Sequence, residues 1–174
     1  MQLNSITGKH TRTSQASGRI NARLARRDEM ISEKQVAGFL DGDGCIGIYR
    51  VKRRRSASWH YVLNVVFAQS RIDKMKILTE IQLKYGGYLI KIKKKKGCQQ
   101  AWALRLTGLS AFELIKDVVE FLIVRRKQAE LAIKFMEYRI ENNGQKYGSK
   151  KLPEIHSFFY GECKEKMNYF NRRG

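Results

Sequence analysis

Two aspartates stand two residues apart in the segment Asp41-Gly42-Asp43-Gly44, directly after a stretch with helical character. Acidic side chains at the C-terminal end of a helix oppose the helix dipole, so their presence there needs a compensating interaction. A bound divalent cation supplies one, because Mg²⁺ takes hard oxygen ligands and is held by few protein groups. The alternative is a turn, since alternating aspartate and glycine are also favourable turn residues.

The same stretch carries small residues on one side. Gly38 and Gly42 are four residues apart, so they lie on one face of a helix. A face with almost no side chains lets a second helix approach backbone to backbone. Ser32 and Gln35 have the spacing of a capping box, which predicts a helix start directly after Ser32. We therefore expect a capped helix that offers a bare face to another helix and ends in two acids.

Further helices and strands surround this segment. Two more serine-led helix starts lie at 70–73 and 110–113, and two other helices are predicted from about 127 to the stop at 142–144 and from 153 to 170. Alternating apolar residues predict strands at 46–51, 61–67, 88–95 and 101–107. The order is helix, hairpin, helix, hairpin, helix, helix. It predicts an α+β fold with one four-stranded antiparallel sheet and helices on one face.

The chain divides into three parts by composition. Residues 1–27 are basic and rich in serine and threonine, and we expect them to form an N-terminal arm. Residues 28–142 hold the helices and hairpins of one domain, and residues 143–174 form a polar linker and the C-terminal helix. We find no internal repeat, so the chain carries a single copy of the two-aspartate segment.

The excess of basic residues limits the classes of partner. The 174-residue chain has 35 Lys and Arg against 16 Asp and Glu, a formal net charge of +19. This charge predicts a nucleic-acid partner, because neutralising phosphates releases counterions. A ribosomal protein or a solvated basic surface is the alternative on composition alone. No apolar run approaches the roughly 20 residues that span a bilayer, there is no signal peptide, and the three cysteines are far apart. We therefore expect an intracellular protein of the cytoplasm, nucleoid or an organelle, neither secreted nor in a membrane.

Basic residues crowd the turns of both predicted hairpins, within residues 50–55 and 91–96. Side chains on a β-ribbon reach base edges in the major groove of DNA, while lysine and arginine contact phosphates. The alternative is a charge run that keeps the hairpin turns in solvent. The predicted nucleic-acid face comprises Gly47, Tyr49, Arg53, Arg55, Asn64, Lys91, Lys93, Gln99 and Arg105.

Residues 36–44, Val-Ala-Gly-Phe-Leu-Asp-Gly-Asp-Gly, closely resemble the LAGLIDADG motif of homing endonucleases. The segment departs from the motif at Val36, Phe39, Leu40 and Gly42 and keeps both acids. The resemblance spans about residues 30–141. It implies the αββαββα fold of that family, in which the four-stranded sheet forms a DNA-binding saddle.

The resemblance also implies a metal site and a dimer interface. Asp43 would be the catalytic metal ligand, with the Gly42 carbonyl as a second ligand, and Asp41 would cap or order the facing helix. The implied dimer interface comprises Val36, Gly38, Phe39 and Gly42.

Two further catalytic residues follow from the resemblance. Gln69 matches in position the polar residue that orders the attacking water at the end of the second strand. Arg125 matches the basic residue that stabilises charge at the cut phosphate, with Arg126 and Lys127 as alternatives. Arginine stands at this place where the family more often has lysine.

A single motif in a chain of this size implies a homodimer, because cutting both strands of a duplex needs two sites. The two-fold axis then implies a long, near-palindromic double-stranded DNA target. The implied activity is Mg²⁺-dependent hydrolysis of phosphodiesters by an intron-encoded homing endonuclease, across the minor groove, leaving short 3′ overhangs. Mn²⁺ is a candidate replacement for Mg²⁺, whereas Ca²⁺ is expected to bind without supporting cleavage. The alternative is a maturase, with RNA as a partner, or a DNA-binding regulator that has lost cleavage.

Overall fold

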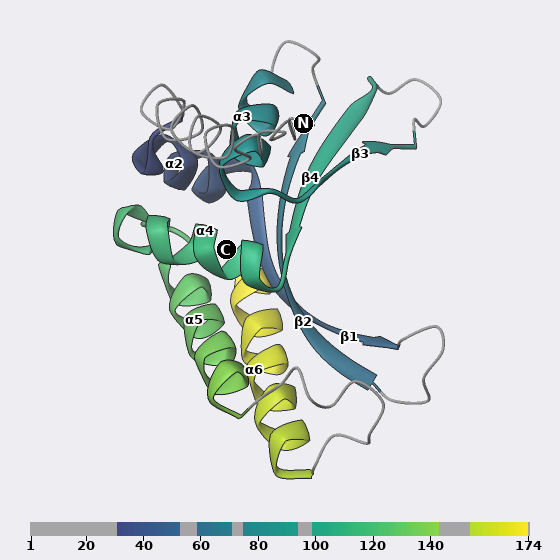
Figure 1. Cartoon of the computed structure of the whole chain (residues 1–174), viewed down its shortest axis with the longest axis vertical. Coiled ribbons are helices and arrows are strands. Elements are labelled where there is room, and N and C mark those ends of the chain that lie inside the picture. The colour runs from purple at the N-terminus through teal and green to yellow at the C-terminus, as the bar shows by residue number, and fades with distance from the viewer. Residues whose placement is uncertain (1–30, 53–58, 71–74, 94–98, 143–153, 174) are drawn as a thin grey trace, which may run out of the picture. The chain divides into compact units, whose positions relative to one another are not determined.

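The structure, a computed structural model, describes residues 31–52, 59–70, 75–93, 99–142 and 154–173, all within one unit of the chain, residues 31–174. Its helices are α2 (Glu33–Asp43), α3 (Met75–Tyr85), α4 (Leu109–Val118), the short 3-10 helix η2 (Val119–Phe121), α5 (Arg126–Glu141) and α6 (Glu154–Arg173). Its strands are β1 (Gly44–Lys52), β2 (Trp59–Gln69), β3 (Tyr88–Ile92) and β4 (Ala101–Thr107). They form one antiparallel sheet in the order β1-β2-β4-β3, and the described helices lie on one side of it (Figure 1). This arrangement confirms the predicted α+β fold.

Strand β2 shows why the sheet has two different faces. Leu63, Val65 and Phe67 are fully buried, and the residues between them are half exposed. Side chains alternate between the two faces of a strand, so the buried set faces the helices. We call this side of the sheet the inner face and the opposite side the outer face.

The N-terminus of α2 has the predicted capping box. The Ser32 side-chain oxygen accepts the backbone N–H of Gln35, and the Gln35 side chain accepts the backbone N–H of Ser32 at 3.0 Å. These two bonds satisfy donors that a helix start otherwise leaves without partners.

The serine-led start predicted at 110–113 is wrong. Helix α4 begins at Leu109 after Gly108, and no side chain caps it. Gly108 has a φ of 59° and donates its N–H to the Leu63 carbonyl at 2.9 Å, so the end of the sheet rather than a serine sets this helix start. Most of the start predicted at 70–73 lies outside the described residues.

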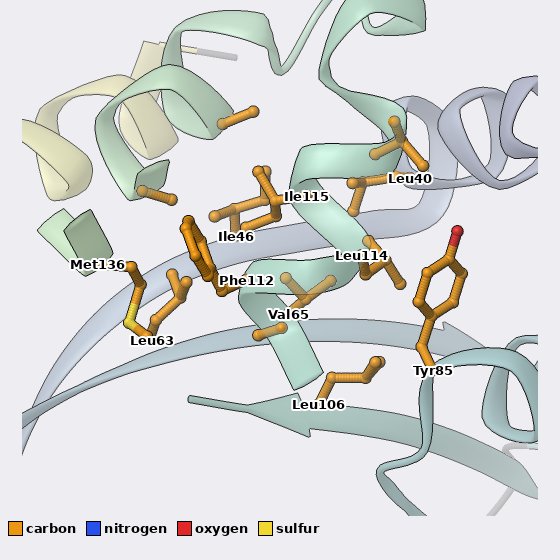
Figure 2. Close-up of a cluster of buried hydrophobic side chains, with 14 of the residues drawn as sticks. Leu40, Ile46, Leu63, Val65, Tyr85, Leu106, Phe112, Leu114, Ile115 and Met136 are labelled. Carbon is orange, nitrogen blue, oxygen red and sulfur yellow. The ribbon is translucent and has the colours of Figure 1, made fainter. Parts of the chain in front are cut away.

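The core lies between the inner face and the helices. Figure 2 shows Ile46, Leu63 and Val65 of the sheet beside Leu40 of α2 and Ile115 of α4. These five side chains are completely shielded from solvent. Among the described residues, no helix is long and apolar enough to cross a membrane.

Helix α6 completes this core from the C-terminal end. Met167 and Tyr160 are buried, and the Tyr160 ring packs edge-on against Phe135 of α5 at 5.3 Å. Asn171 donates its side-chain N–H to the carbonyl of Ile46 in the edge strand β1 at 2.9 Å. Helix α6 therefore buries side chains in the same core as α2 and covers part of a sheet edge.

Replacing a core residue of α6 tests whether this helix is integral to the fold. We expect Met167→Ala to lower the free energy of unfolding by about 2–5 kcal/mol, because it opens a cavity at a residue with 0% exposure. Phe158→Ala on the same helix, where the side chain is 75% exposed, should change it by less than about 0.5 kcal/mol. Urea denaturation measures both, and equal effects would contradict the packing described.

Candidate active site

Asp43 and Gln69 form the centre of the candidate site. Asp43 is the last residue of α2 and is exposed, whereas Gln69 ends β2 and is buried. The Gln69 side-chain nitrogen Nε2 donates a 2.7 Å hydrogen bond to Oδ2 of Asp43. A hydrogen bond to an ionised acceptor is stronger than one between neutral groups. The tertiary structure thus joins two residues that are 26 positions apart and fixes one oxygen of the exposed carboxylate.

Gly44 allows the chain to turn from α2 into β1 immediately after Asp43. A Cβ atom at Gly44 would lie 2.8 Å from the Cα of Leu40 and 2.4 Å from its Cδ1. Contacts this short with backbone exclude any larger residue without a shift of the helix end. The glycine therefore contributes to the position of the Asp43 carboxylate.

The exposed side of α2 has almost no side chains. Gly38 and Gly42 are exposed, and a Cβ added to either would have no heavy atom within 4 Å. Val36, in contrast, is completely buried in the core of its own chain, so its predicted place in the dimer interface is wrong. Phe39 is half buried and stacks on Phe67 of β2, with ring centroids 5.3 Å apart. The two glycines are the part of the predicted interface that faces outward.

Asp41 binds the start of α5 in its own chain. Its Oδ2 accepts the backbone N–H of Ile123 at 2.7 Å and of Val124 at 3.3 Å, and its Oδ1 accepts that of Arg125 at 2.9 Å. No side chain of the segment itself caps α5. The carboxylate therefore caps the segment that leads into α5, an anion placed near the positive end of the helix dipole.

Arg125 contacts the end of α2 in turn. Its side-chain Nε donates to the carbonyl of Leu40 at 2.9 Å, which places a positive charge at the C-terminus of α2. Within the described residues, Arg125 makes no hydrogen bond or ion pair with Asp43 or Gln69. Of the two alternative residues, Arg126 pairs with Glu130 at 3.2 Å, and Lys127 lines a groove with α6 residues such as Glu162. Arg125 is the one of the three that contacts the motif helix.

A groove of about 580 Å³ adjoins the carboxylate. It lies between α2 and α3, and its lining includes Gln35, Asp43, Gln69 and Ile77. In the part of the chain that the structure describes, no three His, Cys, Asp or Glu side chains gather closely enough to hold a metal ion. The groove is also lined by Glu80, whose carboxylate lies 3.9 Å from the Lys76 ammonium, so Asp43 is the one acid of the lining that follows the two-glycine face of α2.

The outer face of the sheet carries part of the predicted nucleic-acid surface. Gly47 pairs with Asn64, out of phase with the inner-face Leu63 and Val65, so both lie on the outer face, where Gly47 is buried and Asn64 is half exposed. Tyr49 is exposed, and its ring lies over Gly47, where a Cβ would meet it at 2.6 Å. The Tyr49 hydroxyl is partly buried, which raises its pKa. Nearby Cys45 raises this pKa further, and Arg105 opposes the shift. The hydroxyl therefore stays protonated at neutral pH and can donate a hydrogen bond.

Strand β3 of the second hairpin alternates in the phase opposite to the prediction, whereas Arg105 of β4 lies on the predicted face. Lys91 pairs with Trp102, whereas Arg105 of the outer face pairs with Tyr88, so Lys91 and Arg105 lie on opposite faces. Lys91 is predicted on the outer face because basic residues crowd the turn of the hairpin. The structure instead directs Leu89 towards the core, and this choice turns every following side chain over. The predicted outer-face position of Lys91 is therefore wrong.

The remaining predicted contacts lie at or beyond the strand ends. Lys93 and Gln99 are exposed, after β3 and before β4 respectively. Arg53 and Arg55 lie outside the described residues.

Removing the Asp41 carboxylate tests its capping role. We expect Asp41→Ala to lower the free energy of unfolding by about 1–2 kcal/mol, because three backbone donors at the start of α5 lose their acceptor. Asp41→Asn keeps one acceptor oxygen and should lose less. Asp117→Ala, at an exposed acid of α4, is the control and should stay within about 0.5 kcal/mol of the wild type. Equal losses for Asp41→Ala and the control in urea denaturation would refute the role.

Comparison with known proteins gives a family and a fold. A family model described as LAGLIDADG endonuclease matches residues 36–140, more than half of the chain. No curated protein sequence matches the chain.

Several solved structures are similar to the chain. The homing endonuclease I-CvuI, solved with the I-CreI target in the presence of 2 mM Mg and with the DNA not cleaved, has a TM-score of 0.62 and 18% identity over 86% of this chain and 83% of its own. The homing endonuclease I-TnaI has a TM-score of 0.56 and 16% identity over 83% of this chain and 98% of its own. The LAGLIDADG homing endonuclease I-SmaMI, bound to cleaved DNA, has a TM-score of 0.60 and 17% identity over 80% of this chain and 44% of its own. The TM-scores show a shared fold. The match of the family model over residues 36–140 shows that the chain belongs to the LAGLIDADG endonuclease family.

Proposed function

We propose that this chain is a site-specific homing endonuclease that cuts both strands of a duplex DNA target as a homodimer. The observation that carries the proposal is the exposed Asp43 carboxylate, held by Gln69 at the end of a helix whose outer side is bare. Family membership, the net charge of +19 and a structural neighbour bound to cleaved DNA support DNA as the substrate.

The donors at this site suit Mg²⁺ when DNA and a second chain complete it. Mg²⁺ is commonly held by one or two carboxylates together with substrate phosphates, rather than by a full cage of protein ligands. Asp43 supplies one exposed carboxylate and Gly42 an adjacent carbonyl, and Asp43 of a second copy would supply another. Bound there, Mg²⁺ would lower the pKa of water and stabilise charge on the attacking and leaving oxygens.

The protein's own residues position the reacting groups. Gln69 holds the Asp43 carboxylate in one orientation through Nε2, which leaves its Oε1 oxygen as an acceptor for the attacking water. Arg125 is fixed by its Nε bond to Leu40, and within the described residues its terminal nitrogens make no hydrogen bond. We assign these nitrogens to the cut phosphate, whose developing charge they would stabilise.

Dimerisation through α2 would place two such sites side by side. The open space beside Gly38 and Gly42 is suited to the same face of a second α2, since a two-fold axis brings identical surfaces together. Each chain would then cut one strand of a long, near-palindromic target.

Removing the charge of Asp43 tests catalysis. We expect Asp43→Asn to lose cleavage of the target duplex in Mg²⁺ by at least about a hundredfold, because a metal ligand is lost while the side chain keeps its size. Binding of the same duplex, measured by gel shift in Ca²⁺, should persist. Cleavage that survives the substitution would refute the role of Asp43. Binding by the wild type without cleavage in Mg²⁺ or Mn²⁺ would favour a regulator or maturase.

A side chain at Gly38 tests the dimer. We expect Gly38→Leu to fold as well as the wild type, since nothing lies within 4 Å of the added Cβ and leucine favours helices more than glycine does. The variant should be monomeric by light scattering and inactive in cleavage, because leucine blocks the approach of the second helix. Glu137→Leu, at an exposed position of α5, should remain dimeric. A wild type that is monomeric in solution and on DNA would contradict the homodimer.

A further inference from the structure

The outer face of the second hairpin is unexpectedly apolar. The strand register pairs Tyr88 with Arg105, Ile90 with Ala103, and Ile92 with Ala101, and paired residues share a face. Tyr88 is 68% exposed, and Ile90 and Ile92 are each 40% exposed. We call Tyr88, Ile90, Ile92, Ala101 and Ala103 the apolar ribbon.

The described part of the chain does not cover this ribbon. The helices lie on the other side of the sheet (Figure 1), and β3 is an edge strand. Exposed isoleucines on an edge strand favour aggregation unless another molecule contacts them. The apolar ribbon therefore has the character of a binding surface.

Charge decides which molecule the ribbon fits. The exposed Arg105 pairs with Tyr88 and shares the face of the ribbon, and the chain as a whole has a net charge of +19. A second copy of the ribbon would bring like charges together, which disfavours self-association through this surface. The major groove of DNA suits it better, since thymine methyl groups project apolar surface into a groove lined on both sides by phosphates.

We propose that the apolar ribbon recognises thymines in the target through their C5 methyl groups, with Ile90 and Ile92 as the residues that determine specificity. The inference rests on the proposed function, since it takes duplex DNA as the substrate. The small side chains of Ala101 and Ala103 leave room for a methyl group beside each isoleucine. Arg105, which pairs with Tyr88 at one end of the ribbon, supplies hydrogen bonds to neighbouring base edges or phosphates. This hairpin thus selects sequence mainly by shape and apolar contact.

Replacing thymine by deoxyuridine tests this directly, because the two bases differ only by the C5 methyl. A duplex target is first selected from a randomised DNA library by cleavage with the wild-type chain in Mg²⁺. Each thymine of that target is then replaced singly by deoxyuridine, and the Kd is measured by fluorescence anisotropy in Ca²⁺. We expect about fourfold weaker binding at one or more thymines of each half-site, the effect of losing one buried methyl group.

Protein variants assign the effect to the ribbon. In Ile90→Ala and Ile92→Ala, the loss caused by deoxyuridine at those thymines should disappear, whereas Lys91→Ala on the same strand should keep it. Because Lys91 lies on the opposite face, any change of Kd in Lys91→Ala should be the same for all sequences. All three positions are exposed, so thermal unfolding should show intact folds.

The outcomes separate the inference from the proposed function. Cleavage of a selected target whose Kd is unchanged by deoxyuridine at every thymine overturns the inference and leaves the endonuclease in place. A deoxyuridine effect that persists in both isoleucine variants overturns the assignment to the ribbon. A chain that cleaves no member of the library, or that retains an RNA pool in preference to DNA, overturns the proposed function and the inference with it.

Discussion

A reciprocal contact between the end of α2 and the start of α5 determines the geometry of the whole site. Asp41 accepts three backbone N–H groups of residues 123–125, and Arg125 donates to the Leu40 carbonyl. Each charge faces the helix end of opposite polarity, so both contacts are favourable to the helix dipoles. The contact also separates the two aspartates of the motif by role. Asp41 is satisfied inside the chain, while Asp43 keeps an exposed carboxylate with Gln69 as its hydrogen-bond donor.

Helix α2 has to be anchored on one side and bare on the other. Val36, Ala37 and Leu40 are fully buried and attach it to the core, and stacking of Phe39 on Phe67 adds a contact at its edge. The opposite side has only hydrogen atoms at Gly38 and Gly42. Glycine in a helix costs up to about 1 kcal/mol relative to alanine, so a stable chain needs compensation elsewhere. The capping box and the buried stripe provide it, and the bare face remains available for a second helix.

The two faces of the sheet have different roles. The inner face forms the core, and the outer face carries both polar groups, such as Arg105 and the Tyr49 hydroxyl, and the exposed isoleucines of β3. In the proposed complex, the basic residues would give affinity for phosphates with little regard to sequence, whereas contacts from the outer face to base edges would discriminate among sequences. The apolar ribbon and the excess of positive charge would then have separate tasks.

Local patterns in the sequence were sufficient to predict the order of helices and strands and the capping box of α2. Ser32 and Gln35 interact across one helical turn, and alternating apolar residues mark each strand without reference to its partners. The resemblance of residues 36–44 to the LAGLIDADG motif, and the family model that matches residues 36–140, agree on the family. These features depend on neighbours in the chain, which the sequence lists directly.

Tertiary structure decided which way the patterns face. An alternating strand has two phases, and β3 takes the one that packs Leu89 against the core. Gly86 and Gly87, with φ of 79° and 101°, form the turn that precedes this strand. A Cβ at Gly87 would lie 2.8 Å from the Arg105 carbonyl, so this turn is closely packed against its partner strand. In the same way, only the tertiary packing shows that Val36 is internal and that Asp41 accepts hydrogen bonds from residues 123–125. Each of these outcomes depends on contacts between residues far apart in sequence, and for that reason the tertiary structure was needed to settle them.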